Sequence, residues 1–320
     1  MLSREEALRV ARCQPISKAV VVQVIVAGLP TLIPPAILAI AIFRFVGLFT
    51  EPALSAERIH QITTGSAPAS AVPAVPAELK IVTWNIERGV RLSAIAATLQ
   101  EFDADVVLLQ EVDRFADRSG NRDIALELGK ALGMHWATVG EFQEIGEGGR
   151  GRGATSNQAI LSRFPILNPQ PIVFSRQKLW RWRVNPMQPR RGSRVAIRAE
   201  TAGVTFYNLH LESGDADDVR REQLEEVLRL HGAAPSAVTV IGGDLNTGDR
   251  ARAGMLQRMA DAGFIDALGP VGSRRTSSKY VQPVDWIFVR GANALGGRVE
   301  QREGISDHYP LVSTVALNRP

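Results

Sequence analysis

Short apolar runs recur along the chain from residue 79 onward, separated by polar turns. Each run is rich in Val and Ile and only four to seven residues long, which is the pattern of buried β-strands. The runs are KIVTW, VVLLQ, QAILS, RVAIRA, VTFYNL, AVTVIGG, DWIFV and LVSTVAL. Three stretches between them repeat apolar residues every third or fourth position, which predicts helices at 92–102, 124–132 and 219–230.

Strand candidates outnumber helix candidates, so the pattern predicts an α/β fold. We expect a four-layer sandwich over residues 79–320, with two mixed β-sheets packed face to face and helices on the outside. No repeat of the solenoid type occurs in this region.

The first fifth of the chain has a different pattern. From Ala19 to Phe43 no residue is charged, a run long enough to cross a hydrocarbon core roughly 30 Å thick. We therefore expect a membrane segment at 19–49, preceded by a basic flank at 1–18 that favours a cytoplasmic N-terminus. The prolines within the run leave a kinked helix, a re-entrant segment or a long signal sequence as alternatives.

Residues 50–78 are rich in Ala and Pro. The stretch from Thr63 to Ala77 has neither charge nor hydrophobic period, which is typical of a semi-extended linker. We therefore expect the catalytic domain to start near Leu79, on the exported side of the membrane.

Composition limits the chemistry. The 320 residues are 45% apolar, enough for a sizeable core. Cys13 is the only cysteine, which excludes an internal disulfide and a cysteine-rich zinc site. A metal would need carboxylate, amide or imidazole ligands, and such oxygen-rich sites favour a hard cation.

Polar residues follow four of the predicted strands. Asn85 ends KIVTWN, Glu111 ends VVLLQE, His210 ends VTFYNLH, and Asp244 and Asn246 follow AVTVIGG. Open α/β sheets bind ligands at the carboxyl ends of their strands. The pattern therefore places these five side chains at one rim.

Three further polar residues precede strands instead of following them. Asp285 begins DWIFV, and Asp307 and His308 precede YPLVSTVAL. These two strands must run antiparallel to the others to reach the same rim, which a mixed sheet allows. A single Asp or Asn beside a strand is more often a turn former than a ligand. The ordered set of eight residues favours a functional site.

The sequence resembles the endonuclease/exonuclease/phosphatase superfamily, the DNase I-like hydrolases. The resemblance spans nearly all of 79–317 and rests on six stretches that occur in the family's order. They are Thr83-Trp84-Asn85-Ile86, Leu109-Gln110-Glu111-Val112, Asn208-Leu209-His210-Leu211, Gly242-Gly243-Asp244-Leu245-Asn246, Val284-Asp285-Trp286-Ile287 and Ser306-Asp307-His308.

The resemblance implies a metal-dependent cleavage of phosphoesters. Glu111 would be the principal ligand of Mg²⁺ or Mn²⁺, with Asn85 helping to hold the ion and Asp307 lying near it. Asp244 would orient or deprotonate the attacking water, and Asn246 would hydrogen-bond the oxygens that gain charge in the transition state.

His308 would contact the phosphate and assist proton transfer, while Asp285 would fix its tautomer. His210 is followed by Leu, as in the branches that resemble DNase I and sphingomyelinase. The abasic-site endonucleases have a different stretch here, so the resemblance disfavours DNA repair.

A basic segment interrupts the motifs. Between Gly148 and Ala199 there is no Asp or Glu, and QKLWRWR at 177–183 alternates tryptophan with cations, which suits lipid headgroups or nucleic-acid bases as well as a solvated surface. We expect substrate contacts from the Gly-rich loop, from the SNQAILSRFPI stretch after it and from the RSGNRD cluster. The residues are Arg118, Asn121, Arg150, Arg152 and Asn157.

Three functions fit these observations. The first is a membrane-tethered phosphodiesterase or phosphatase that acts on an exposed phosphoester such as a lipid headgroup. The second is an exported, non-specific nuclease of DNase I type, with nucleic acid as its partner. The third, a catalytically silent binding module, is disfavoured because every motif residue is present. We expect no obligate protein partner.

Overall fold

The computed structural model describes most of the chain from residue 51 onward. The described stretches are residues 51–66, 73–148, 153–178, 188–233, 235–269 and 274–317. The basic flank at 1–18 and the membrane segment predicted at 19–49 lie outside them. None of the helices in these stretches combines the length and apolar character needed to span a membrane.

The first sheet in the described part of the chain has eight strands in the order β1-β4-β5-β3-β2-β14-β13, with β7 also paired to β4. β2 and β3 are parallel, whereas β14 runs antiparallel to β2. The strands are β1 (Thr63–Gly65), β2 (Glu78–Arg88), β3 (Val106–Arg114), β4 (His135–Glu144), β5 (Thr155–Ser162), β7 (Arg190–Gly192), β13 (Asn293–Val299) and β14 (Leu311–Ala316).

The second sheet has six strands among the described residues, in the order β11-β12-β10-β9-β8-β6. β9 and β10 are parallel, and β12 is antiparallel to β10. The strands are β6 (Leu167–Val173), β8 (Val195–Thr201), β9 (Val204–His210), β10 (Thr239–Asp244), β11 (Ile265–Asp266) and β12 (Asp285–Arg290). Both sheets are mixed, as predicted.

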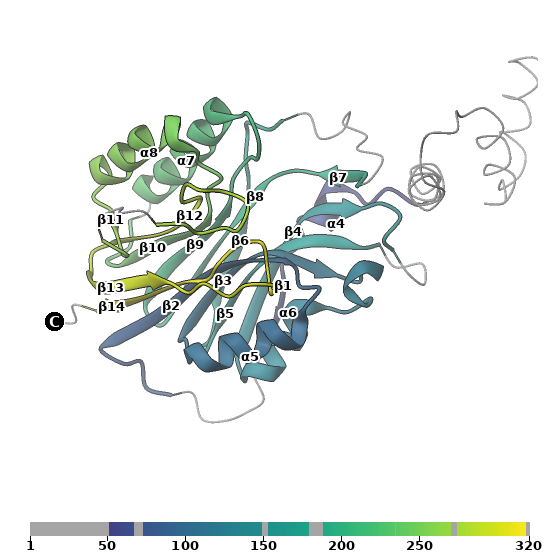
Figure 1. The fold of residues 1–320 in the computed structure, drawn as a ribbon, viewed down its shortest axis with the longest axis horizontal. Helices are drawn as coiled ribbons and strands as arrows, with labels where there is room; N and C mark the ends of the chain where they lie inside the picture. Colours follow the sequence, from purple (N-terminus) through teal and green to yellow (C-terminus); the bar gives the residue numbers. More distant parts are fainter. Residues whose placement is uncertain are drawn as a thin grey trace, which may run out of the picture.

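The two sheets pack face to face with helices on both outer faces (Figure 1). Apolar side chains such as Leu108 on β3 and Phe206 on β9 form the core between the sheets. A second core lies under α5 and α6, and a third under α7 and α8. The helices are α4 (Ala56–Ile59), α5 (Leu92–Phe102), α6 (Ile124–Leu132), α7 (Asp217–Ala233) and α8 (Asp249–Asp261), with a 3₁₀ turn, η1, at Asp117–Ser119.

Local signals explain the helices that the pattern predicted. Asp123 caps α6 by accepting a hydrogen bond from the Leu126 amide, and Gly133 ends it with a φ of 64°. The pattern missed α8, whose charged sequence buries only Met255 and Met259 deeply. It also missed β4, in which nine of ten residues are buried, and the edge strands β6 and β13, which expose most of their residues.

The domain begins earlier than predicted. Of the linker expected at 50–78, residues 51–65 pack on the first sheet: β1 pairs antiparallel with β4, and Ile59 is buried. The Nδ1 atom of His60 lies 2.8 Å from the carbonyl oxygen of Gly140. Backbone pairing can order a segment without a hydrophobic period, which is why composition alone misplaced this boundary.

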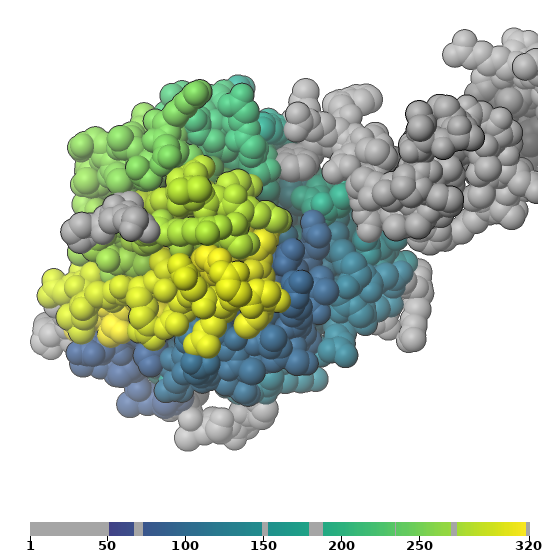
Figure 2. All heavy atoms as spheres, viewed as in Figure 1, coloured from purple at the N-terminus to yellow at the C-terminus, as the bar shows by residue number. Residues whose placement is uncertain are grey.

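β14 joins two regions that are far apart in the sequence. It pairs with β2, so the last described strand completes a sheet begun by the first strands. In Figure 2 the yellow residues of the C-terminal strands lie between the green half of the molecule and the blue half. The predicted antiparallel direction of β12 and β14 is confirmed, and it brings Asp285 and His308 to the rim.

Candidate active site

Asn85 and Glu111 come from neighbouring strands of the first sheet whose pairing is irregular at this point. The register of β2 against β3 shifts between Asn85 and Arg88, and Glu111 has a positive φ of 52°. Such backbone is uncommon outside glycine and concentrates at functional sites. The Glu111 side chain is 30% exposed, and its Oε1 atom lies 3.4 Å from the Nδ2 donor of Asn85.

Asp244, His210 and Asp285 come from adjacent strands of the second sheet. Asp244, the last residue of β10, is the register partner of His210 on one side and of Asp285 on the other. Gly243 has a φ of 140°, and a Cβ atom there would lie 1.9 Å from the Leu209 carbonyl oxygen. Only glycine allows β10 to lie this close to β9.

Side chains from both sheets converge on the Oδ2 atom of Asp244. The Asn85 Nδ2 atom donates a hydrogen bond to it at 3.2 Å. The Nε2 atoms of His210 and His308 lie 3.6 and 3.7 Å away. All four side chains are buried. One carboxylate thus faces an amide and two imidazoles, an arrangement suited to holding and activating a water molecule.

His308 reaches this point from the loop before β14. The Nε1 atom of Trp84 donates to its carbonyl oxygen at 2.8 Å, and its amide donates to the Ser306 hydroxyl at 3.1 Å. The Ser306 hydroxyl in turn donates to the Asn85 carbonyl oxygen at 2.7 Å. These bonds fix the loop against β2, so the end of the first sheet positions the imidazole.

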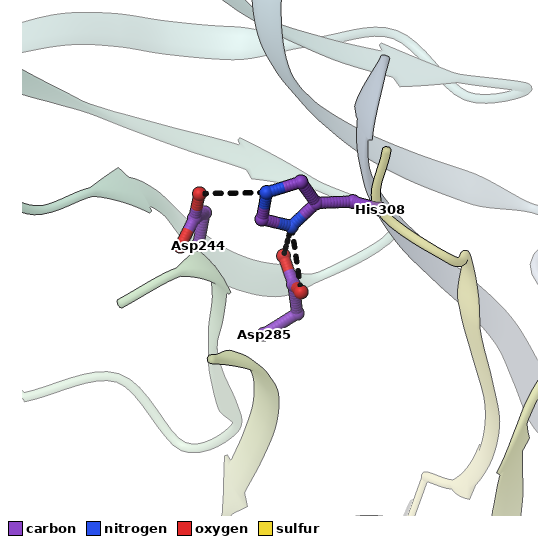
Figure 3. Close-up of side chains that lie close together, drawn as sticks. All are labelled: Asp244, Asp285 and His308. Carbon is purple, nitrogen blue, oxygen red and sulfur yellow. Dashed lines mark hydrogen bonds and ion pairs between the residues drawn. The ribbon is translucent and has the colours of Figure 1, made fainter. Parts of the chain in front are cut away.

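Asp285 orients the His308 ring, as Figure 3 shows. The Nδ1 atom of His308 lies 2.9 and 3.1 Å from the two carboxylate oxygens of Asp285, and Nε2 points toward Asp244. Burial by itself would lower the pKa of His308, but the charges of Asp285 and Asp244 outweigh it and raise the pKa to about 10. The imidazole is therefore protonated at neutral pH.

His210 has a carboxylate partner of its own. Its Nδ1 atom lies 3.1 Å from Oε2 of Glu141, which comes from β4 of the opposite sheet. Burial would raise the pKa of Glu141, but the charges of His210 and Arg194 outweigh this and the pKa is lowered. Two carboxylate and imidazole pairs therefore flank Asp244, one through each histidine.

Cations surround Glu111. Burial would raise its pKa, yet the charges of His210, Arg88, Arg190 and other groups lower it to about 2. The Nε atom of Arg88 lies 3.9 Å from a Glu111 oxygen. Glu111 stays ionised at all physiological pH values, so a divalent cation would not have to displace a proton from it.

The oxygen donors at this rim fit a hard divalent cation. Glu111 offers a partly exposed, ionised carboxylate, and Asp307 offers a second one that pairs with Lys279. The charges of Asp307 and Glu111 both raise the pKa of Lys279, together with a hydrogen bond from Lys279 to Asp307. Asn85 fits the ligand role less directly, because its Oδ1 atom accepts the Glu87 amide at 3.1 Å and its nitrogen faces Glu111.

Asp244, Asp285 and His308 form a second potential metal group, with ligand atoms within 4.8 Å of one another. An ion bound here would have to displace the proton that the charges of Asp285 and Asp244 favour on His308 by raising its pKa. The arrangement is better suited to handling protons, with Glu111 and Asp307 as the preferred oxygen donors for an ion.

Asn246 lies beside the cluster. It has a positive φ of 48°, and its amide donates to Oδ1 of Asp244 at 3.0 Å. Its Nδ2 atom donates to the Leu211 carbonyl oxygen at 3.2 Å. All eight motif residues therefore gather at the predicted rim, although their chemical roles remain predictions.

Arg118 differs from expectation in that carboxylates hold its side chain, although it lies close to Arg190, whose charge acts on Glu111. The Arg118 guanidinium makes two hydrogen bonds to Asp113, at 2.7 and 2.8 Å, and a third to Glu144 at 3.1 Å. The side chain is only 13% exposed. Asn121 lies in the turn after η1, with a φ of 57°. Both residues shape the fold around β3 and β4.

Asn157 also differs from expectation. It lines a cavity of about 480 Å³ between α4 and the outer face of the first sheet, together with Gly140 and Arg114. That cavity shares none of the eight motif residues. Arg150 and Arg152 lie outside the described residues, as does most of QKLWRWR.

The described arginines of the basic segment are partly structural. Arg190 pairs with Glu144 at 2.9 Å, and Arg194 pairs with Glu141 at 3.4 Å. Neither is a fully solvated surface charge, since their side chains are 15% and 4% exposed. Sequence reasoning missed Glu141, Arg88 and Arg190 around the site. Glu141 is the only charged residue in the otherwise uncharged run HWATVGEF, and this isolation could have marked it as a functional candidate.

Comparison with known proteins agrees with this arrangement. Residues 82–308 match the model of the endonuclease/exonuclease/phosphatase family. No curated protein matches the sequence.

Several solved structures share the fold. An endonuclease/exonuclease/phosphatase from Beutenbergia cavernae DSM 12333 is 20% identical, with a TM-score of 0.58 over 75% of this chain and 72% of that one. A functionally unknown conserved protein from Enterococcus faecalis V583 is 18% identical, with a TM-score of 0.54 over 75% and 100%. The endonuclease/exonuclease/phosphatase from Bacteroides vulgatus is 15% identical, with a TM-score of 0.54 over 75% and 99%.

Proposed function

The chain belongs to the endonuclease/exonuclease/phosphatase family, and from this premise we propose that it is a membrane-tethered, Mg²⁺- or Mn²⁺-dependent phosphoester hydrolase acting on a lipid headgroup. The observation that carries the chemistry is the convergence of Asn85, His210 and His308 on one oxygen of Asp244. The proposed anchor is the membrane segment at 19–49, whose uncharged run covers Ala19 to Phe43, with the catalytic domain on the exported side.

In this proposal Asp244 holds the attacking water and accepts its proton. His308, protonated and oriented by Asp285, donates a hydrogen bond to a phosphate oxygen and supplies a proton to the leaving group. His210, held by Glu141, adds a second donor beside the developing charge. Glu111 and Asp307 would hold the divalent cation, which when bound withdraws charge from a phosphate oxygen.

The first experiment identifies the substrate class. The full-length protein would be assayed against sphingomyelin, phosphatidylinositol, inositol phosphates, RNA, plasmid DNA and a soluble aryl phosphodiester, with and without Mg²⁺. EDTA should abolish turnover, and Mg²⁺ or Mn²⁺ should restore it. Preferential cleavage of DNA would replace the lipid proposal with the alternative, an exported nuclease of DNase I type.

Asp244→Ala and His308→Ala test the chemistry on whichever ester is cleaved. Each should lower turnover by on the order of a hundredfold or more with little change in substrate affinity, because the interactions act mainly in the transition state. Asp285→Asn should cost less than His308→Ala, since it keeps the shape and removes only the charge. Folded variants with near wild-type rates would refute the assignment.

The topology has a separate test. A reporter that is active only outside the cytoplasm, fused after Thr63, should be active, and the full-length chain should resist alkaline extraction from membranes. Activity of a cytoplasmic reporter at the same position would show that the domain is not exported.

A further inference from the structure

The described chain begins at the rim that carries the active site. Because β4 and β3 both run antiparallel to β5, their carboxyl ends lie at one edge of the sheet. Glu51 binds the Gly146 amide just past the end of β4, at 3.0 Å. In Figure 1, α4 lies on the right with this edge, and the C-terminal end of β14 lies on the left.

The distance from the proposed anchor to this rim is short. The membrane segment was placed at 19–49, its uncharged run ends at Phe43, and Glu51 is already bound to the domain. The two residues after position 49 span at most about 7 Å, and the eight residues after Phe43 span at most about 28 Å. β4 is two strands away from β3, or roughly 10 Å at the usual strand spacing. The anchor would therefore hold the active-site rim close to the bilayer.

Apolar side chains protrude at the same rim. Val281 is 85% exposed and Tyr280 41% exposed, and the Tyr280 ring centroid lies 6.4 Å from that of His308. Val90, in the turn after β2, is 50% exposed. Val281 is the most exposed large apolar residue in the described part of the chain. A valine this open to water, next in sequence to Tyr280, has no role in the core.

Cations flank these apolar residues. Lys279, next to Tyr280, is 60% exposed, and Arg91, next to Val90, is 49% exposed. Each also pairs with one carboxylate, Asp307 or Glu87. Aliphatic and tyrosine side chains set among basic ones match the boundary between headgroups and acyl chains of an anionic membrane. A nucleic acid would engage Tyr280 by stacking but would leave Val281 in water.

We propose that the loop Lys279–Val281 and the turn at Val90 insert into the surface of an anionic bilayer, so that the active site opens onto the headgroups of the same membrane. This inference rests on the proposed function, because it uses the anchor at 19–49 and a lipid-borne phosphoester. It adds an orientation. The catalytic rim faces the membrane, and the opposite end of the first sheet, where β13 begins, points away from it.

The test measures how deeply position 281 lies in the membrane. Cys13 is the only cysteine, so Cys13→Ser provides a background for one added thiol. Val281→Cys in the full-length chain would be labelled with an environment-sensitive dye and reconstituted into vesicles of phosphatidylcholine and phosphatidylserine. Leu295→Cys is the matched control, because Leu295 is 53% exposed and lies on β13 near the opposite end of the sheet.

The label at 281 should shift to shorter emission wavelengths and be quenched by lipids that carry a spin label near the headgroup, within the roughly 5–10 Å boundary zone. The label at 295 should instead be quenched by aqueous iodide. Equal iodide quenching at both positions would overturn the proposal. A shift at 281 caused by single-stranded DNA and not by vesicles would overturn it in favour of nucleic-acid binding.

Turnover separates this proposal from the proposed function. Val281→Asp should lower hydrolysis of a vesicle-borne ester by a larger factor than hydrolysis of the soluble aryl phosphodiester, on the order of tenfold more if the valine is buried in the membrane. An equal effect on both esters would overturn the membrane contact. A wild-type chain that cleaves neither ester would refute the hydrolase function, while the depth of the label would still be measured.

Discussion

Two side chains of the site are charged although burial favours their neutral forms, because neighbouring groups of opposite charge stabilise them. His308 is kept protonated by Asp285 and Asp244, and Glu111 is kept ionised by the cations around it. Neither state would persist if the partner groups were removed, because an isolated buried charge is neutralised instead. The site therefore functions as a set of mutually dependent charges.

The raised pKa of His308 predicts a dependence of stability on pH. The folded pKa of about 10 exceeds the unfolded value of 6.5. The protonated imidazole therefore contributes stability in full below pH about 6.5, and this contribution is lost as the pH rises through about 10. The difference in melting temperature between wild type and His308→Gln should shrink over that range. A difference that stays constant would contradict the assigned pKa.

Glu141→Gln tests the residue that sequence reasoning missed. The change keeps the shape but removes the carboxylate charge that orients the His210 ring. Turnover should fall by about 10- to 100-fold, because the imidazole loses the partner that fixes its orientation. Asp113→Asn is the control, since it weakens a buried ion pair with Arg118 away from His210. Equal losses in both variants would point to a general structural effect.

Single residues of the site were predictable where both the residue type and its position next to a predicted strand indicated a functional role. The eight motif residues follow or precede strands, and the structure brings them together. The pairing of Arg118 with Asp113, five positions before it, and with Glu144, 26 positions after it, was not predicted, because the sequence pattern does not show which carboxylates a cation will contact. Asn157 was misplaced because successive residues of a strand point to opposite faces, and a motif match does not say which face is functional.

At the scale of elements, the segment 51–65 is part of the fold. A chain that begins at residue 74 should be less stable than one that begins at residue 51 by about 3 kcal/mol or more, because it loses the burial of Ile59 and the hydrogen bonds of β1. Ile59→Ala within the longer chain should cost about 2 kcal/mol or more. Urea unfolding of the three proteins measures both values, and equal stabilities would mean that the segment is only a tether.

The helices that were predicted correctly have strong periodic patterns, as α5 and α6 do, and α6 also has clear caps at both ends. The missed elements owe their structure to neighbours. β1 has three residues and exists by pairing with β4, and α8 buries little besides two methionines. Edge strands such as β13 carry a weak pattern, because one side faces solvent and the alternation is interrupted by glycine.

At the scale of the whole molecule, the site requires the two sheets to stay in register. Asn208 on β9 donates to the carbonyl oxygens of Leu109 and Ala159 at 2.8 and 2.9 Å, and it accepts from Gln110 at 2.6 Å. This buried group links the sheets directly beneath the active site. The layered fold was predictable from pattern, but this link was not, because it depends on how the sheets are stacked.

Asn208→Leu should therefore affect stability and catalysis together. It removes three buried hydrogen bonds, one from Gln110 and two to carbonyl oxygens, which should cost about 3 kcal/mol, and it loosens the alignment of Asp244 with Glu111, so kcat should fall. Thr205→Val is the control, because its hydroxyl bonds Ser236 within one half of the molecule. A loss of kcat in the control equal to that in Asn208→Leu would argue against the linking role.

The position of β14 in the chain has a consequence for biosynthesis. After β5 the chain adds only the short strand β7 to the first sheet while it makes the second sheet, and it then returns with β13 and β14, of which β14 lies beside β2. A ribosome therefore delivers Glu111, His210 and Asp244 long before His308. The growing polypeptide has no complete set of acid and base groups until β14 has been synthesised and has paired with β2. A hydrolase with this chain order is therefore inactive during its own synthesis.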